Sequence, residues 1–136
     1  MSFRSYMNVA LEQANAAASR GEVPVGAVIA GPDGIIAADG NRTRELNDPT
    51  AHAEILVIRR ACETLCQERL SGYDIYVTLE PCAMCAAAIS NARLARLYYG
   101  ASDAKSGGVA QGARVFSHPQ CHHRPEIYDG IAAAEA

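Results

Sequence analysis

The sequence has 136 residues, of which 49% are hydrophobic, and this length suits one compact domain with a sizeable core. Its net charge of −3 and its pI of about 5.8 give no overall indication of nucleic-acid binding, for which a basic protein is usual. No apolar run is long enough to cross a bilayer, and the N-terminus lacks the pattern of a secretory signal, so the five cysteines are expected to be reduced thiols or metal ligands in the cytoplasm.

The first predicted elements are a helix and a hairpin. Apolar residues recur at helical spacing from Phe3 to Arg20, where Ser2 can cap the start and Gly21 can end the helix. The apolar, β-branched stretch Val23–Ala30 predicts a buried strand. The turn sequence GPDG then leads to a second strand over Ile35–Ala38, which completes the hairpin.

After a polar loop, the chain alternates between helices and strands. Thr50 can cap a helix from Ala51 to about Arg69, and Pro81 suits the first position of a helix that runs to about Arg93. The remaining predicted elements are strands over residues 73–79, 95–99 and 126–128. Because the sheet begins with a hairpin, the order predicts one α/β domain over residues 1–136, with a central mixed sheet of about five strands flanked by helices.

Two cysteines begin the helix after Pro81, in the stretch TLEPCAMC. Cys82 and Cys85 stand three residues apart, which places both sulfurs on one helix face, and the positive end of the helix favours thiolates there. Thiolates at this spacing suit zinc. A redox C-x-x-C pair, or two cysteines that merely pack, are the alternatives for the pair alone.

The second half of the candidate site is His52 and Glu54, in the stretch TAHAE. The pattern H-x-E followed by P-C-x-x-C is the signature of zinc-dependent base deaminases. Residues i and i+2 do not share a helix face, so Glu54 is not expected to bind the ion beside His52. Three protein ligands would leave the fourth zinc position to water, which is typical of a catalytic site.

The other cysteines and histidines form a weaker candidate. Cys62 and Cys66 are interpreted as small core residues of one helix. The run Cys121-His122-His123 could bind a metal, but no second ligand cluster lies near it in the sequence.

An open zinc with a carboxylate beside it predicts hydrolysis. Two thiolates cancel the charge of the ion, so its water needs a nearby base, for which Glu54 is the natural candidate. The resulting zinc-bound hydroxide would attack an electron-poor, amidine-like ring carbon, and Glu54 would carry the proton to the departing amine. The expected products are a carbonyl and ammonia.

Four stretches resemble the bacterial tRNA-specific adenosine deaminases of the cytidine/deoxycytidylate deaminase superfamily. They are EVPVGAV (22–28), NDPTAHAE (47–54), YVTLEPCAMC (76–85) and GASDAKSG (100–107), and the likeness runs from about Tyr6 to Ile131. The resemblance implies a three-layer α/β/α cytidine-deaminase-like fold. It also implies conversion of the wobble adenosine of a tRNA anticodon to inosine, one Zn²⁺ per subunit, and a homodimer whose tRNA site uses both subunits.

The resemblance also implies roles for individual residues. His52, Cys82 and Cys85 would bind zinc, Glu54 would be the catalytic proton shuttle, and Asn41 would hydrogen-bond the base. The full set of implied substrate-binding residues is Val25, Asn41, Ala53, Asp103 and Lys105, of which the last two would contact the anticodon loop. A local basic rim of Arg42, Arg44, Lys105, Arg114 and Arg124 could then hold RNA on an acidic protein.

The sequence departs from the family pattern at its C-terminal end, and two other functions are alternatives to tRNA deamination. The family usually continues into a further helix with aromatic and basic residues, whereas residues 131–136 read IAAAEA. A deaminase of free guanine, cytosine or nucleotides would share the zinc signature, since a signature transfers mechanism better than substrate. A non-catalytic, zinc-stabilised binding module is the other alternative, but such a module has no need of Glu54.

Overall fold

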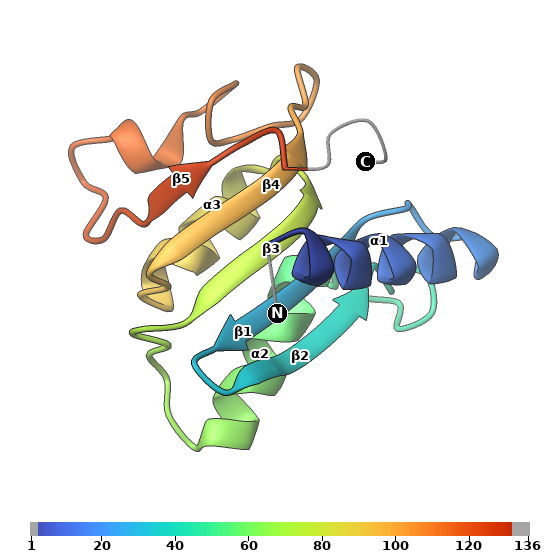
Figure 1. Ribbon diagram of the computed structural model, residues 1–136. Helices are drawn as coiled ribbons and strands as arrows, with labels where there is room; N and C mark the ends of the chain where they lie inside the picture. The colour runs from blue at the N-terminus through green and yellow to red at the C-terminus, as the bar shows by residue number, and fades with distance from the viewer. Residues whose placement is uncertain (1–2, 132–136) are drawn as a thin grey trace.

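The computed structural model describes residues 3–131 and has the predicted α/β architecture. Its elements are α1 (Phe3–Ser19), β1 (Gly26–Gly31), β2 (Gly34–Gly40), α2 (Ala53–Leu65), β3 (Asp74–Leu79), α3 (Ala83–Asn91), β4 (Arg96–Ala101), the 3-10 helix η1 (Val115–Ser117) and β5 (Glu126–Tyr128). The sheet order is β2-β1-β3-β4-β5. Helix α1 covers one face and helices α2 and α3 cover the other (Figure 1). The prediction of a three-layer fold is confirmed.

The sheet is mixed, as the initial hairpin predicts. Strand β1 pairs antiparallel with both β2 and β3, whereas β3, β4 and β5 are parallel to one another. Strands β3 and β4 therefore end at the same edge of the sheet. Helix α2 starts beyond the end of β2 and α3 starts directly after β3, so both helix N-termini lie close to this edge (Figure 1).

Alternate residues of the central strands point to opposite faces, so the protein has two cores. Val28 and Ala30 belong to the core under α1, and Ala27 and Ile29 belong to the larger core against α2 and α3. This alternation follows from the two-residue period of a strand. Within residues 3–131, no helix is both long and apolar enough to span a bilayer.

Two paired glycines let α1 lie close to the sheet. Gly26 and Gly40 are register partners in the β1–β2 ladder. A Cβ atom on Gly26 would overlap the backbone of Ala10, and one on Gly40 would overlap the backbone of Gln13. The helix backbone therefore rests directly on the two strands, and this contact requires glycine at both positions.

A row of tyrosines crosses the sheet under α1. Tyr76 and Tyr98 stack with ring centroids 4.5 Å apart, and Tyr98 stacks on Tyr128 at 5.0 Å. Tyr6 of α1 meets Tyr76 at 5.2 Å in a tilted arrangement. Such offset pairs add to the stabilisation that comes from burying the rings.

Several predicted boundaries were wrong by a few residues. Strand β1 begins at Gly26 rather than Val23. Helix α2 does not begin at Ala51 under a Thr50 cap, because the N–H and hydroxyl of Thr50 both donate to Asp48 Oδ1. It ends at Leu65 rather than near Arg69, since Cys66 adopts the left-handed conformation (φ 54°).

Helix α3 begins at Ala83, so Pro81 lies before the helix and not at its first position. The proposed Ser2 cap lies outside the described residues, as does the tail over residues 132–136.

Candidate metal centre

His52 is the residue that immediately precedes the first turn of α2. Its backbone is extended (φ −71°, ψ 153°), and its side chain makes no hydrogen bond that caps the helix. The imidazole therefore remains available to other partners. It points across to α3, where its Nδ1 atom lies 3.7 Å from Cys82 Sγ and 3.5 Å from Cys85 Sγ.

The two cysteines occupy the matching place on α3. Cys82 precedes the helix with extended backbone (φ −70°, ψ 174°), and Cys85 lies in the first turn and is buried. The ligand atoms of His52, Cys82 and Cys85 all lie within 4.8 Å of one another. Among the described residues, this is the one group of three or more histidine, cysteine or acidic side chains arranged to hold a metal ion.

The charges of this group suit a cation. Hydrogen bonds from Cys85 and His52 hold the pKa of Cys82 at about 4, so this sulfur is a thiolate at neutral pH. The hydrogen bond to Cys82, together with burial, raises the pKa of Cys85, and the hydrogen bond to Cys82 raises the pKa of His52 against the effect of burial. Metal binding requires deprotonated thiols, so a divalent cation would displace the proton of Cys85.

Glu54 lies beside the three ligands and is 3% exposed. Its Oε1 atom is buried and, within the described part of the chain, has no hydrogen-bond partner. Burial raises the pKa of Glu54 to about 7, against the lowering effect of its own backbone N–H. A carboxyl group with a pKa near neutrality can both accept and donate a proton at physiological pH. Its unpaired oxygen leaves room for a water or a substrate atom.

A cavity of about 220 Å³ opens onto His52, Glu54 and Cys82. Three of the predicted substrate-binding residues line it, namely Val25, Asn41 and Asp103. Sequence reasoning missed four further lining residues: Val23, Leu79, Glu80 and Ser106. Val23 and Glu80 stand inside the EVPVGAV and TLEPC stretches, so their neighbours in the sequence were the available signal.

Two of the predicted substrate-binding residues do not line this cavity. Ala53 is fully buried, and its N–H donates to Asn41 Oδ1 at 2.8 Å. Ala53 therefore acts through its backbone, by orienting the Asn41 amide. Lys105 lies on the same loop as Asp103 but is exposed to solvent outside the cavity.

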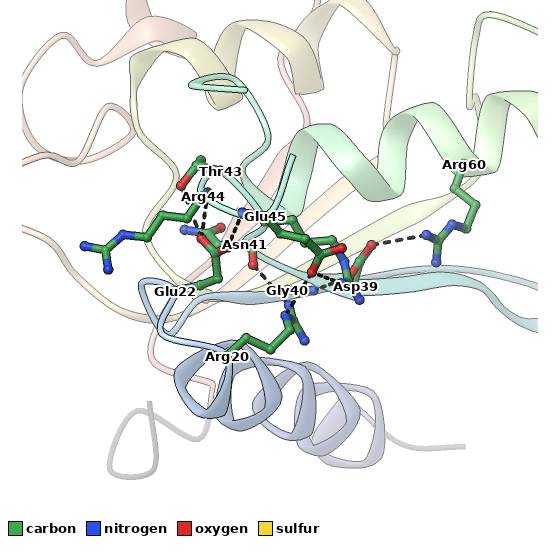
Figure 2. Close-up of polar contacts among 10 residues, drawn as sticks. Arg20, Glu22, Asp39, Gly40, Asn41, Thr43, Arg44, Glu45 and Arg60 are labelled. Carbon is green, nitrogen blue, oxygen red and sulfur yellow. Dashed lines mark hydrogen bonds and ion pairs between the residues drawn. The ribbon is translucent and has the colours of Figure 1, made fainter. Parts of the chain in front are cut away.

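The loop that carries Asn41 is held by buried carboxylates (Figure 2). Glu22 accepts hydrogen bonds from the Thr43 hydroxyl and from the N–H groups of Arg44 and Glu45. Arg20 donates to the backbone carbonyl of Asn41 at 3.0 Å. These contacts tie the loop to the end of α1 and to the segment before β1, and so fix one wall of the cavity.

The predicted basic rim is reduced by internal ion pairs. Arg42 pairs with the buried Asp39 at 2.9 Å and with Glu45 at 2.7 Å, so its charge is largely used within the protein. The other four members, Arg44, Lys105, Arg114 and Arg124, are exposed.

The remaining cysteines and histidines have structural contacts. Cys121 donates to the backbone carbonyl of His123, and His123 Nε2 lies 2.7 Å from the carbonyl of Leu94. Ser90 of α3 also donates to the His123 carbonyl, at 2.7 Å, so this segment is pinned to the end of α3. Cys62 packs against the core as predicted, but Cys66 is exposed and the prediction for it was wrong.

Comparison with known proteins places this site in context. The MafB19-like deaminase family matches residues 1–131. A tRNA-specific adenosine deaminase of Agrobacterium fabrum is 62% identical over 131 residues, which are 96% of this chain and 86% of that protein.

Two solved structures are also similar. One, from work on A-to-I editing by tRNA:A34 deaminases at the wobble position of transfer RNA, has 62% identity and a TM-score of 0.95, covering 96% of this chain and 95% of the other. A guanine deaminase of Bacillus subtilis has 31% identity and a TM-score of 0.76, covering 94% of this chain and 85% of the other.

Proposed function

The chain belongs to the tRNA-specific adenosine deaminases, and on this premise we propose that it converts adenosine to inosine at the wobble position of a tRNA anticodon. The observation that carries the proposal is the cavity in which His52 and Cys82 lie beside the Glu54 carboxylate, whose Oε1 atom has no hydrogen-bond partner among residues 3–131. A binding module would gain nothing from a buried carboxyl group that costs stability. A hydrolase needs such a group to move protons.

We propose that the metal is zinc, held by His52, Cys82 and Cys85. In a tetrahedral site with Zn–S of about 2.3 Å and Zn–N of about 2.0 Å, a sulfur and a nitrogen lie about 3.5 Å apart. The two observed distances from His52 Nδ1 to sulfur, 3.5 and 3.7 Å, fit this requirement. Bound there, zinc would acidify water and supply the nucleophile for attack on the base.

Glu54 would move the protons of the reaction. Water adds to C6 of adenine, and Glu54 takes a proton from that water and gives it to ring nitrogen N1. Glu54 then transfers the second water proton to the exocyclic amine, which leaves as ammonia and generates the C6 carbonyl of inosine. Its pKa of about 7 suits both directions of transfer.

Asn41 would orient the base. Its Oδ1 atom is occupied by the Ala53 N–H, so its side-chain NH₂ group is the part left for the cavity. An NH₂ group donates hydrogen bonds and would select an acceptor on the purine. Val25 would pack against the ring from the same wall of the cavity.

The RNA partner would be an unpaired loop, because a base must leave its stack to enter a cavity of this kind. Lys105 and the exposed arginines offer positive charge around an acidic protein. We propose action in the cytoplasm and, as the resemblance implies, a homodimer with one zinc per subunit. Light scattering on the purified protein measures the oligomeric state.

The deciding experiment compares substrates on one metal-analysed sample. Inosine formation is followed on an anticodon stem-loop with adenosine at the wobble position and on free adenosine, and ammonia release is followed in parallel on free guanine and cytosine. We expect turnover of the stem-loop and about one zinc per chain. Turnover of free guanine alone would assign the chain to the activity named for its Bacillus subtilis relative and remove the tRNA proposal.

A further inference from the structure

We propose that Glu80 is a positioning residue for substrate recognition, because its carboxylate holds the loop of residues 102–111 that forms one wall of the cavity. Below, this segment is called the Glu80 loop. The inference rests on the proposed function, since it assigns the loop to recognition of the RNA substrate. It concerns a side chain that acts through its neighbours and takes no part in the chemistry.

One carboxylate accepts hydrogen bonds from both ends of the Glu80 loop. Glu80 Oε1 accepts from the Ser102 hydroxyl at 2.9 Å and from the Asp103 N–H at 3.1 Å. Glu80 Oε2 accepts from three consecutive N–H groups at 3.0 Å each, those of Val109, Ala110 and Gln111. Glu80 itself is 3% exposed. Hydrogen bonds to a buried charge are among the strongest in proteins.

Five hydrogen bonds make Glu80 the main anchor of the Glu80 loop. The loop lies between β4 and η1 and belongs to no strand or helix. Within the loop, Asp103 Oδ1 accepts from the N–H groups of Lys105 and Ser106, and the Asp103 carbonyl accepts from the Gly107 N–H. The Gln111 side chain also donates to the Ser102 hydroxyl at 3.3 Å, and the Gly108 N–H donates to the Pro81 carbonyl at 2.8 Å. If Glu80 were removed, three adjacent N–H groups would lose their acceptor, and the loss is most unfavourable for the Val109 N–H, whose hydrogen bond is buried.

The loop backbone also packs directly on the carboxylate. A Cβ atom on Gly107 would overlap both the Glu80 carboxylate and the Asp103 carbonyl. Gly107 therefore permits the close approach that the hydrogen bonds require. This contact offers a way to disturb the arrangement from the loop side, away from Cys82.

The consequence of this arrangement falls on the substrate cavity. Asp103 and Ser106 line it together with Asn41, Val25, His52 and Glu54. A loop released from Glu80 would move these two side chains relative to the base, and a displacement of about 1 Å can lower a rate about a hundredfold. Glu80 would thus control how well the cavity fits its RNA substrate.

Glutamine is the sharpest replacement, because it keeps the shape of glutamate. Its NH₂ group must face either the three N–H groups at Oε2 or the Asp103 N–H at Oε1, so donor meets donor in both orientations. Glu80→Gln should therefore loosen the Glu80 loop. Gly107→Ala should do the same without a change next to the metal ligand.

Lys105 makes loosening of the Glu80 loop directly measurable, because it is the only lysine in the sequence and is exposed. A lysine-specific protease can cut the folded chain only after this residue. We expect Glu80→Gln and Gly107→Ala to raise the cleavage rate at least tenfold and to lower kcat/KM on the stem-loop about a hundredfold, with the zinc content unchanged. Ser90→Ala, which removes the hydrogen bond of a buried residue near the C-terminal end of α3, is the matched control and should change neither rate.

The outcomes separate this proposal from the proposed function. Cleavage at the wild-type rate in both variants would overturn the role of Glu80 in holding the loop. Faster cleavage with unchanged kcat/KM would overturn its role in recognition. If Glu80→Gln loses zinc, Gly107→Ala decides alone. If the wild-type protein does not deaminate the stem-loop, the proposed function fails, whereas the protease result still reports on the loop.

Discussion

Replacement of Glu54 with glutamine is expected to stabilise the metal-free protein and to abolish turnover. Burial raises the pKa of Glu54 from 4.5 to about 7. At about 1.36 kcal/mol per pH unit, this difference corresponds to about 3 kcal/mol. Because the folded-state pKa is the higher one, the stability is fully present below pH 4.5 and is lost as the pH rises to about 7. The glutamine variant has no charge to bury, so its stability should not fall over this pH range.

The assay is urea unfolding between pH 4 and pH 8 in the presence of a chelator. The stability difference between Glu54→Gln and the wild type should grow by about 3 kcal/mol across this range, or about 10 °C in Tm at the alkaline end. Glu63→Gln, an exposed change on the same helix, should show no such trend. A pH-independent difference would refute the reasoning from burial. Stem-loop deamination by the zinc-loaded glutamine variant would refute the proton-transfer role.

Three further predictions concern the walls of the cavity. Asn41→Ala leaves the buried Ala53 N–H without its acceptor, so the free energy of unfolding should fall by about 1–3 kcal/mol in urea titrations. Burial acts to raise the pKa of Glu22, but hydrogen bonds from the Glu45 and Arg44 N–H groups lower it below 4.5. Wild-type stability should therefore fall as the pH drops below 4.5, whereas the stability of Glu22→Gln should not. If the glutamine variant loses as much stability over the same pH range, the charge of Glu22 does not anchor the loop. Lys105→Gln should lower the salt dependence of stem-loop binding by about one phosphate contact, whereas Arg96→Gln, at the opposite end of β4, should leave it unchanged.

The fold and the ligand set could be predicted because their signals are local. Apolar periodicity indicates which face of each helix and strand is buried, and these buried faces predict helices packed on both sides of the sheet. The ligands follow short patterns at helix starts, where the backbone itself directs His52, Cys82 and Cys85 toward one another.

The contacts that shape the cavity could not be predicted, because they join distant parts of the chain. The donors to Glu80 lie 22 to 31 residues further along, so its place in the TLEPC stretch indicates that it lies near the site but not which loop it holds. The sequence predicts that Arg42 is one of the basic residues around the RNA site, yet its guanidinium forms an ion pair with the buried Asp39. Thr50 has a cap-like sequence position, but Asp48 competes successfully for its hydroxyl. Which partner a side chain binds depends on the packing of the folded protein, and this cannot be inferred from the sequence alone.

The tyrosine row gives the protein an optical signal of its own. The sequence has six tyrosines and no tryptophan, so no indole obscures phenol fluorescence or near-ultraviolet dichroism. Four of the six stand in contact from α1 to β5, with Tyr76 and Tyr98 almost parallel at 8°. Coupled rings of this kind should give a dichroic band that vanishes when α1 lifts from the sheet. Unfolding can therefore be followed on the unlabelled protein, at a place remote from the metal ligands.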